Sequence, residues 1–157
     1  MSDPITPAGM SALKARYDHL FTTERPQMVE VVSWAAGNGD RSENGDYLYG
    51  RKRLREIDRE LGHLSRRMKD LQVVDPSRQP DKSRIFFGAT IKVVDEDDRE
   101  QTLTLVGRDE ADAGAGRIAW NSPVAIALKG ARIGETRTAR LPAGERYLEV
   151  LEISYPS

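Results

Sequence analysis

The chain contains no cysteine among its 157 residues. Disulfide bonds, thiolate zinc sites and cysteine nucleophiles are therefore excluded together. Aromatic residues make up only 6% of the sequence and hydrophobic residues only 38%, whereas charged residues reach 31%. This composition is typical of a molecule with much surface for each residue, such as an exposed helix pair, rather than of one compact globule.

The sequence also lacks an excess of charge and a long hydrophobic run. Lysine plus arginine (24) nearly balances aspartate plus glutamate (25), so we expect no general affinity for nucleic acids or membranes. No stretch approaches the roughly 18 apolar residues that a membrane span needs. The N-terminal residues 1–4 show no basic region followed by an apolar run, which a signal peptide would have. We therefore expect a cytoplasmic protein without a membrane partner.

An apolar seam runs along the segment between residues 47 and 71. Its positions alternate between spacings of three and four residues, and charged residues fill the outside. A seam this narrow predicts a coiled coil with one partner helix and with water on the other sides. The seam consists of Tyr47, Gly50, Leu54, Ile57, Leu61, Leu64, Met68 and Leu71.

The partner helix is predicted just upstream. Thr6 and Pro7 are suited to the N-cap and first turn of a helix. Pro26 removes one helical hydrogen bond and clashes with the preceding turn, so we expect a kink or short break near residues 22–26. A turn-rich connection at 37–42 makes the two helices antiparallel, and at 1.5 Å per residue the hairpin should extend on the order of 45 Å and project. The seam of this first helix is predicted to include Met10, Leu13, Tyr17, Leu20, Val31 and Trp34.

The pattern changes after Val74. Residues 75–81 contain two prolines and no other apolar residue, which is typical of a linker. Beyond the linker, short alternating stretches predict a small, mainly β domain with one brief helix capped by Ser122. The predicted domains are a hairpin at 1–75, a linker at 76–83 and a β domain at 84–157. The predicted strands cover 85–94, 101–106, 117–120, 136–141 and 146–155, and the helix covers 123–129.

Two carboxylates mark the connection between the helices. Asp40 and Glu43 have the spacing of a capping box at the start of the second helix, which is a structural interpretation. Alternatively, both carboxylates are presented from the end of a rod. Such a pair does not hold magnesium tightly alone, because the ion keeps most of its waters until further oxygen ligands arrive. The two interpretations are compatible.

Several short motifs follow one another along nearly the whole chain. The first half carries Glu24-Arg25-Pro26, Trp34-Ala35-Ala36, Gly39 to Asn44, Asp46-Tyr47 and Arg51 to Asp58. The second half carries Phe86 to Ala89, Val106-Gly107, Asp109-Glu110, Ser122-Pro123 with Ala127-Leu128, and Pro142-Ala143-Gly144. In this order the motifs resemble the bacterial Gre factors. Arg41 in the connection, the Glu-Arg-Pro step and the Phe-Phe-Gly-Ala run favour the GreB branch.

The resemblance implies a function that spacing does not. Gre factors insert their coiled coil through the secondary channel of RNA polymerase when the enzyme has backtracked, and their FKBP-like domain grips a polymerase coiled coil at the channel rim. The acidic pair then helps to hold a second Mg²⁺ in the polymerase active site. Carried over, Asp40 is the expected magnesium ligand and Glu43 the expected water-positioning partner. We expect an accessory factor rather than an enzyme, which is a monomer when free and binds no Mg²⁺ stably alone.

Two further sets of residues have a structural and a functional interpretation. Arg51, Lys52, Arg53 and Arg55 are either the solvated outside of the coiled coil or, as the resemblance implies, a patch that contacts extruded RNA. Ser122 and Pro123 are a helix start, and they are also candidates for the polymerase contact. Trp34 and Tyr47 are expected to pack at the end of the hairpin rather than to stack on bases.

Two departures from the family pattern concern the connection. Gly45 replaces the usual alanine and Gly37 adds a flexible position, so the cleavage rate is in question more than the function. One alternative function is an inhibitor that enters the same channel without assisting cleavage. Another is a binding module for an unrelated partner. His19 and His63 are expected to be surface residues rather than metal ligands.

Overall fold

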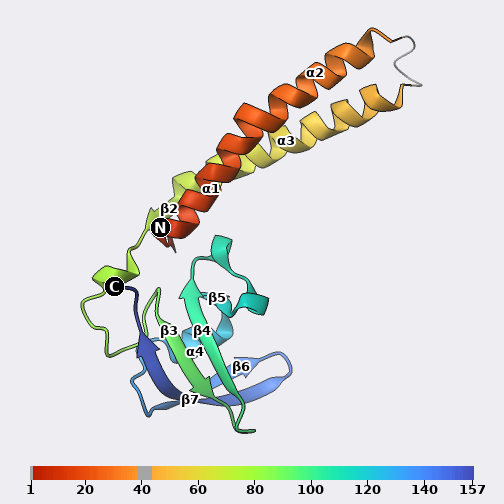
Figure 1. The fold of residues 1–157 in the computed structure, drawn as a ribbon. Coiled ribbons are helices and arrows are strands. Elements are labelled where there is room, and N and C mark those ends of the chain that lie inside the picture. The colour runs from red at the N-terminus through yellow and green to blue at the C-terminus, as the bar shows by residue number, and fades with distance from the viewer. Residues whose placement is uncertain (1, 39–43) are drawn as a thin grey trace. The chain divides into compact units, whose positions relative to one another are not determined.

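The computed structural model describes residues 2–38 and 44–157, which form two compact units (Figure 1). The helical unit comprises Met10–Asp70, and the mainly β unit comprises Met1–Gly9 together with Leu71–Ser157. The predicted α+β organisation, with a helical hairpin before a mainly β domain, is confirmed.

The first residues of the chain belong to the β unit. Strand β1 (Asp3–Ile5) pairs in parallel with strand β2 (Leu71–Val73), and the side chain of Ile5 is fully buried. The carboxylate of Glu110 accepts a hydrogen bond from the backbone N–H of Thr6 at 3.0 Å. These contacts tie the beginning of the chain to the β unit, whereas the sequence pattern had grouped it with the hairpin.

Helix α1 (Pro7–His19) begins as predicted, because the hydroxyl of Thr6 accepts a hydrogen bond from the N–H of Gly9 at 3.1 Å. The sequence predicts a kink or a short break near residues 22–26, and of these the break is wrong. The helix instead passes through a π turn, η1 (Leu20–Glu24), and continues without interruption as α2 (Arg25–Ala36). The N–H of Arg25 bonds to the carbonyl of Leu20, five residues back. The wider turn accommodates the proline, which lacks an N–H and crowds the preceding carbonyl.

Helix α3 (Gly45–Asp70) packs against this long helix and completes the antiparallel hairpin. Its predicted seam is confirmed over most of its length, because Gly50 and three large residues of the seam are buried. The cluster inside the hairpin contains Leu20, Ile57, Leu61 and Leu64, with Leu13, Tyr17, Met28 and Met68 packed against it.

The β unit is built on one five-stranded sheet with the order β5-β4-β3-β7-β6. Its neighbours are antiparallel except for β4 and β5, which run parallel. The elements are β3 (Thr90–Val94), β4 (Glu100–Val106), β5 (Arg117–Ala119), α4 (Pro123–Leu128), β6 (Thr136–Leu141) and β7 (Gly144–Ser154), with 3₁₀ turns η2 (Pro76–Arg78), η3 (Arg108–Glu110) and η4 (Ala113–Ala115).

The segment before β3 differs from the prediction. The strand expected from Ile85 begins only at Thr90, because the chain turns at Gly88, where φ is +86°. The side chain of Pro76 fills the space beside Gly88 and is buried, so the expected linker at 76–83 begins with a residue packed on the β unit. Ile85 is fully buried and joins the core of the sheet.

Two glycines inside α3 differ in how closely other atoms approach them, and substitutions at both test how tightly α2 and α3 pack. A methyl group at Gly50 would lie 2.6 Å from Cγ2 of Val32, whereas one at Gly62 would meet only the guanidinium end of Arg66. We expect Gly50→Ala to destabilise the hairpin by about 1 kcal/mol, because overpacking outweighs the gain in helix propensity. The matched Gly62→Ala should stabilise it by roughly 0.5–1 kcal/mol. Thermal unfolding followed by far-UV circular dichroism measures both effects, and equal shifts would contradict the packing.

Candidate functional site

The two helices of the hairpin are joined by a hydrogen bond next to their connection. The side-chain amide of Asn44 donates to the carbonyl of Ala35 at 2.7 Å, and its oxygen accepts from the N–H of Tyr47 at 3.1 Å. Asn44 therefore caps α3 and bridges to α2 with one side chain. Asp40 and Glu43, the predicted magnesium and water-positioning residues, lie outside the described residues.

The π turn changes which residues of α2 face α3. One extra residue in the turn rotates everything after it by about 100° relative to a regular α-helix. The predicted seam through Val31 and Trp34 is consequently displaced by one position. Val32 lies against Gly50, Ala35 is fully buried, and Trp34 is 64% exposed. The expectation that Trp34 packs at the end of the hairpin is therefore wrong.

The four predicted RNA-binding residues do not share one environment. Arg51, Lys52 and Arg55 are exposed on α3, and Arg51 donates to the hydroxyl of Tyr47 at 2.9 Å. Arg53 is half-buried at the interface of the helices. Its guanidinium contacts Glu24 at 2.8 Å and Glu56 at 3.4 Å. The structure thus brings three of the four to the outer surface, and their role in RNA binding stays a prediction.

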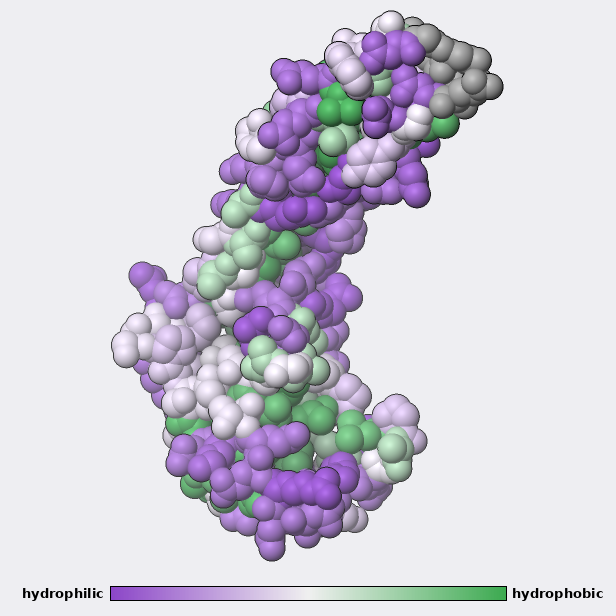
Figure 2. All heavy atoms as spheres, turned by 45° about the vertical axis from the view of Figure 1, so that its right-hand side comes forward, coloured by the Kyte–Doolittle hydropathy of each residue, from purple (hydrophilic) through white to green (hydrophobic). Residues whose placement is uncertain are grey.

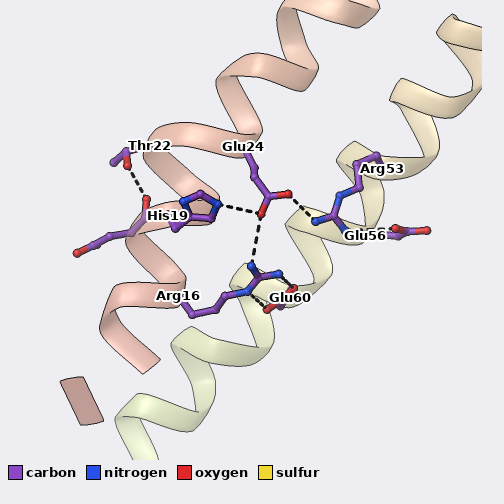
Figure 3. Close-up of polar contacts among 8 residues, drawn as sticks. Arg16, His19, Thr22, Glu24, Arg53, Glu56 and Glu60 are labelled. Carbon is purple, nitrogen blue, oxygen red and sulfur yellow. Dashed lines mark hydrogen bonds and ion pairs between the residues drawn. The ribbon is translucent and has the colours of Figure 1, made fainter. Parts of the chain in front are cut away.

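Glu24 is the centre of a network of ion pairs between the π turn and α3 (Figure 3). One of its oxygens accepts from Arg53, and the other lies 3.5 Å from Arg16 and 3.6 Å from the imidazole of His19. The hydrogen bond from Arg53 lowers the pKa of the Glu24 carboxyl below its usual value, against a smaller opposing effect of burial. Arg16 also forms a two-pronged pair with Glu60, at 2.8 and 3.0 Å. Sequence patterns had not indicated this network, because it depends on the π turn.

Ser122 and Pro123 lie where α4 begins. The hydroxyl of Ser122 accepts from the N–H of Ala125 at 3.4 Å, so the predicted helix start is confirmed. The next residue, Val124, lines an open pocket of about 590 Å³ whose wall mixes apolar and charged side chains. Residues in and next to the β3–β4 and β6–β7 turns supply its charged side chains. The lining includes Asp95, Glu96, Arg99, Leu103, Ile118, Leu141, Glu145, Arg146 and Leu148.

Residues 2–38 and 44–157 contain no group of three or more acidic or histidine side chains placed to bind a metal ion. In the same residues, no helix combines the length and the apolar character that crossing a bilayer requires.

Both halves of the chain match family models. The model described as "Transcription elongation factor, N-terminal" matches residues 3–73, and the model described as "Transcription elongation factor, GreA/GreB, C-term" matches residues 79–155.

Similar proteins carry consistent names. The chain is 48% identical over 151 residues to transcription elongation factor GreB of Neisseria meningitidis serogroup B, covering 96% of this chain and 93% of the relative. It is 43% identical to GreB of Pseudomonas aeruginosa, covering 97% and 90%. The predicted resemblance to the GreB branch is confirmed. Among solved structures, GreA factor homolog 1 of Thermus thermophilus covers 98% of this chain and 99% of its own at 16% identity, with a TM-score of 0.44.

The Glu24 network predicts a dependence of stability on pH. Because the pKa of Glu24 is lowered in the folded protein, its contribution is present at neutral pH and is lost as the pH falls through the lowered value. We expect Glu24→Gln to lower the unfolding temperature at pH 7 and to have little effect at a pH below the lowered pKa of Glu24. Glu30→Gln, an exposed glutamate of α2 that makes no ion pair with described residues, is the control. A Glu24→Gln effect of equal size at both pH values would contradict the assignment.

Proposed function

The chain belongs to the GreA/GreB family of transcription elongation factors, and we propose from this that it stimulates the cleavage of backtracked RNA by RNA polymerase. The observation that carries the proposal is the antiparallel pairing of α2 and α3. The hydrogen bond between Asn44 and Ala35 joins the two helices at the end of the hairpin, and the segment of chain between these two residues contains Asp40 and Glu43. We infer that the hairpin enters the secondary channel of the polymerase and brings this acidic pair to the active site.

The acidic pair is suited to a shared metal site. Carboxylate oxygens are the donors that Mg²⁺ prefers, but two carboxylates leave most of its six positions to water or to another molecule. Asp40 would supply a ligand to a Mg²⁺ held mainly by the polymerase, and Glu43 would orient the attacking water. The metal would supply charge stabilisation at the scissile phosphate. In this proposal the protein is an accessory factor that lends ligands, and it has no nuclease activity of its own.

The exposed cations of α3 fit a second role in the same process. Arg51 and Arg55 are one helical turn apart, and Arg59 continues the series on the same face. A stripe of cations at this spacing can follow the phosphates of an extruded RNA strand without reading its sequence. Arg53 supports the hairpin instead, because its charge is paired with Glu24 and Glu56.

The β unit would hold the factor on the polymerase. Ser122 and Pro123 stand next to Val124, which lines the open pocket. A pocket that combines apolar and charged side chains suits the docking of a helical protein element such as the coiled coil at the channel rim. Residues 122 and 123 would then fix the edge of this docking surface while they begin α4.

The acidic pair is tested by Asp40→Asn. This substitution removes one negative charge and keeps the size of the side chain, so binding to the polymerase should change little. We expect release of short 3′ RNA fragments from backtracked complexes to fall by about 100-fold, in line with losing a ligand to a reacting site. The cleavage rate and the binding constant are measured on the same complexes.

Glu30→Gln serves again as the matched control, because it removes an exposed carboxylate from α2. Full cleavage by Asp40→Asn would contradict the proposal. Reduced initiation in a run-off assay, with no RNA fragments from the unchanged protein, would favour a channel inhibitor.

The RNA contact is tested by salt dependence. Replacing Lys52 and Arg55 with alanine removes two exposed charges, and each phosphate contact contributes nearly one unit to the slope of log affinity against log salt. We expect the double variant to bind complexes with extruded RNA more weakly and with a slope lower by about 1–2. An unchanged slope would show that these residues are only the solvated face of the hairpin.

A further inference from the structure

Two exposed aromatic side chains lie near the connection end of the hairpin and have no part in the function proposed above. Trp34 is 64% exposed and Tyr49 is 61% exposed. Tryptophan is usually among the more buried residues, and single exposed apolar residues on a surface need no explanation. Two large aromatics that share one edge of a helix pair are a different case. Figure 2 shows that hydrophilic residues cover most of the hairpin surface, with hydrophobic residues reaching it in patches.

The position of Tyr49 follows from the ion pairs of α3. Arg53 reaches across to Glu24 and thereby marks one edge of the helix pair. On the opposite edge, Arg25 pairs with Asp58 at 2.8 Å. Tyr49 precedes Arg53 by four residues, or one turn, and so lies on the Glu24–Arg53 edge.

The position of Trp34 follows from the contacts of α2. Val31 comes seven residues, or two turns, after Glu24 and so lies on the Glu24–Arg53 edge, where its Cγ1 is 3.7 Å from the place of a methyl group on Gly50. Trp34 follows Val31 by three residues and extends this edge. The hydrogen bond between Ala35 and Asn44 brings this part of α2 level with the first turn of α3. Trp34 and Tyr49 therefore project from the same edge of the hairpin, within about one turn of each other.

The charge of this edge decides between an RNA and a protein as its partner. A polyanion needs unpaired cations beside the aromatic rings. Arg53 is already paired with Glu24 and Glu56, whereas Arg55 and Arg59 point to the outer face of α3. Lys52 follows Tyr49 by three residues and is an exposed cation beside this edge, but one lysine is not the row of cations that a strand of RNA follows. An aromatic edge with few unpaired charges is instead typical of the centre of a protein–protein contact, where tryptophan, tyrosine and arginine are enriched.

We propose that Trp34 and Tyr49 form an aromatic contact edge that packs against an apolar protein surface of RNA polymerase. The inference rests on the proposed function, since it takes the polymerase as the partner of the hairpin. The hairpin would then have two working faces. Its basic outer face contacts RNA, and its aromatic edge contacts protein and fixes how the hairpin is rotated about its long axis.

The experiment compares the binding of variants to core RNA polymerase without nucleic acid and to backtracked complexes. We expect Trp34→Ala and Tyr49→Ala each to weaken binding by about tenfold, equally in both cases and with no change in the salt slope. Trp34→Phe should restore much of the loss. Phe21→Ala is the matched control, because Phe21 is also exposed, at 55%, but stacks on Tyr17 within the hairpin. Circular dichroism verifies that each variant is folded.

Two outcomes overturn the inference while leaving the proposed function intact. In the first, both variants bind core polymerase as tightly as the unchanged protein does. In the second, the loss occurs only when RNA is extruded, which would indicate stacking on bases. If the unchanged protein itself fails to bind the polymerase or to release RNA fragments, the proposed function fails and not only the aromatic edge.

Discussion

The structure of the hairpin depends on how a helix accommodates one proline. Pro26 has no N–H to donate and crowds the carbonyl one turn before it. Instead of breaking, the helix widens at Leu20–Glu24, and the hydroxyl of Thr22 bonds to the carbonyl of Asp18 at 2.6 Å. A π turn keeps the helix continuous and adds one residue to it. Every residue of α2 is therefore rotated relative to the pattern of α1.

The ion pairs of the π turn hold the rotated register in place. Glu24 and Arg25 are consecutive, yet they pair with Arg53 and Asp58 on opposite edges of α3. If α2 were rotated or shifted against α3, both ion pairs would be separated. Val32 would also no longer lie against the bare Cα of Gly50. Each exposed pair contributes little alone, but two pairs and a close helix contact together select one alignment. The sequence Glu24-Arg25-Pro26 therefore contains both the proline that causes the π turn and the two charged residues whose ion pairs with α3 hold the resulting register.

Much of this fold follows from sequence patterns, and the exceptions have physical reasons. The seam of α3 and the caps at Thr6 and Ser122 were predictable, because periodicity and capping act locally. The π turn was not, since a proline inside a helix can also produce a kink or a break. The exposure of Trp34 and the pairing of Arg53 follow from the π turn and were missed with it. Strands β1 and β2 have only three residues each, which is too short for an alternating pattern. For the candidate site, Asp40 and Glu43 were identified by resemblance, because their spacing alone also fits a capping box.

The register set by the π turn is the central claim, and Trp34 reports on it directly. The chain has two tryptophans, so replacing Trp120 by phenylalanine leaves Trp34 as the only source of tryptophan fluorescence. With the register described, the emission should be shifted to the red as for a tryptophan in water, and acrylamide should quench it freely. Blue-shifted emission protected from acrylamide would place Trp34 inside the seam and would contradict the account.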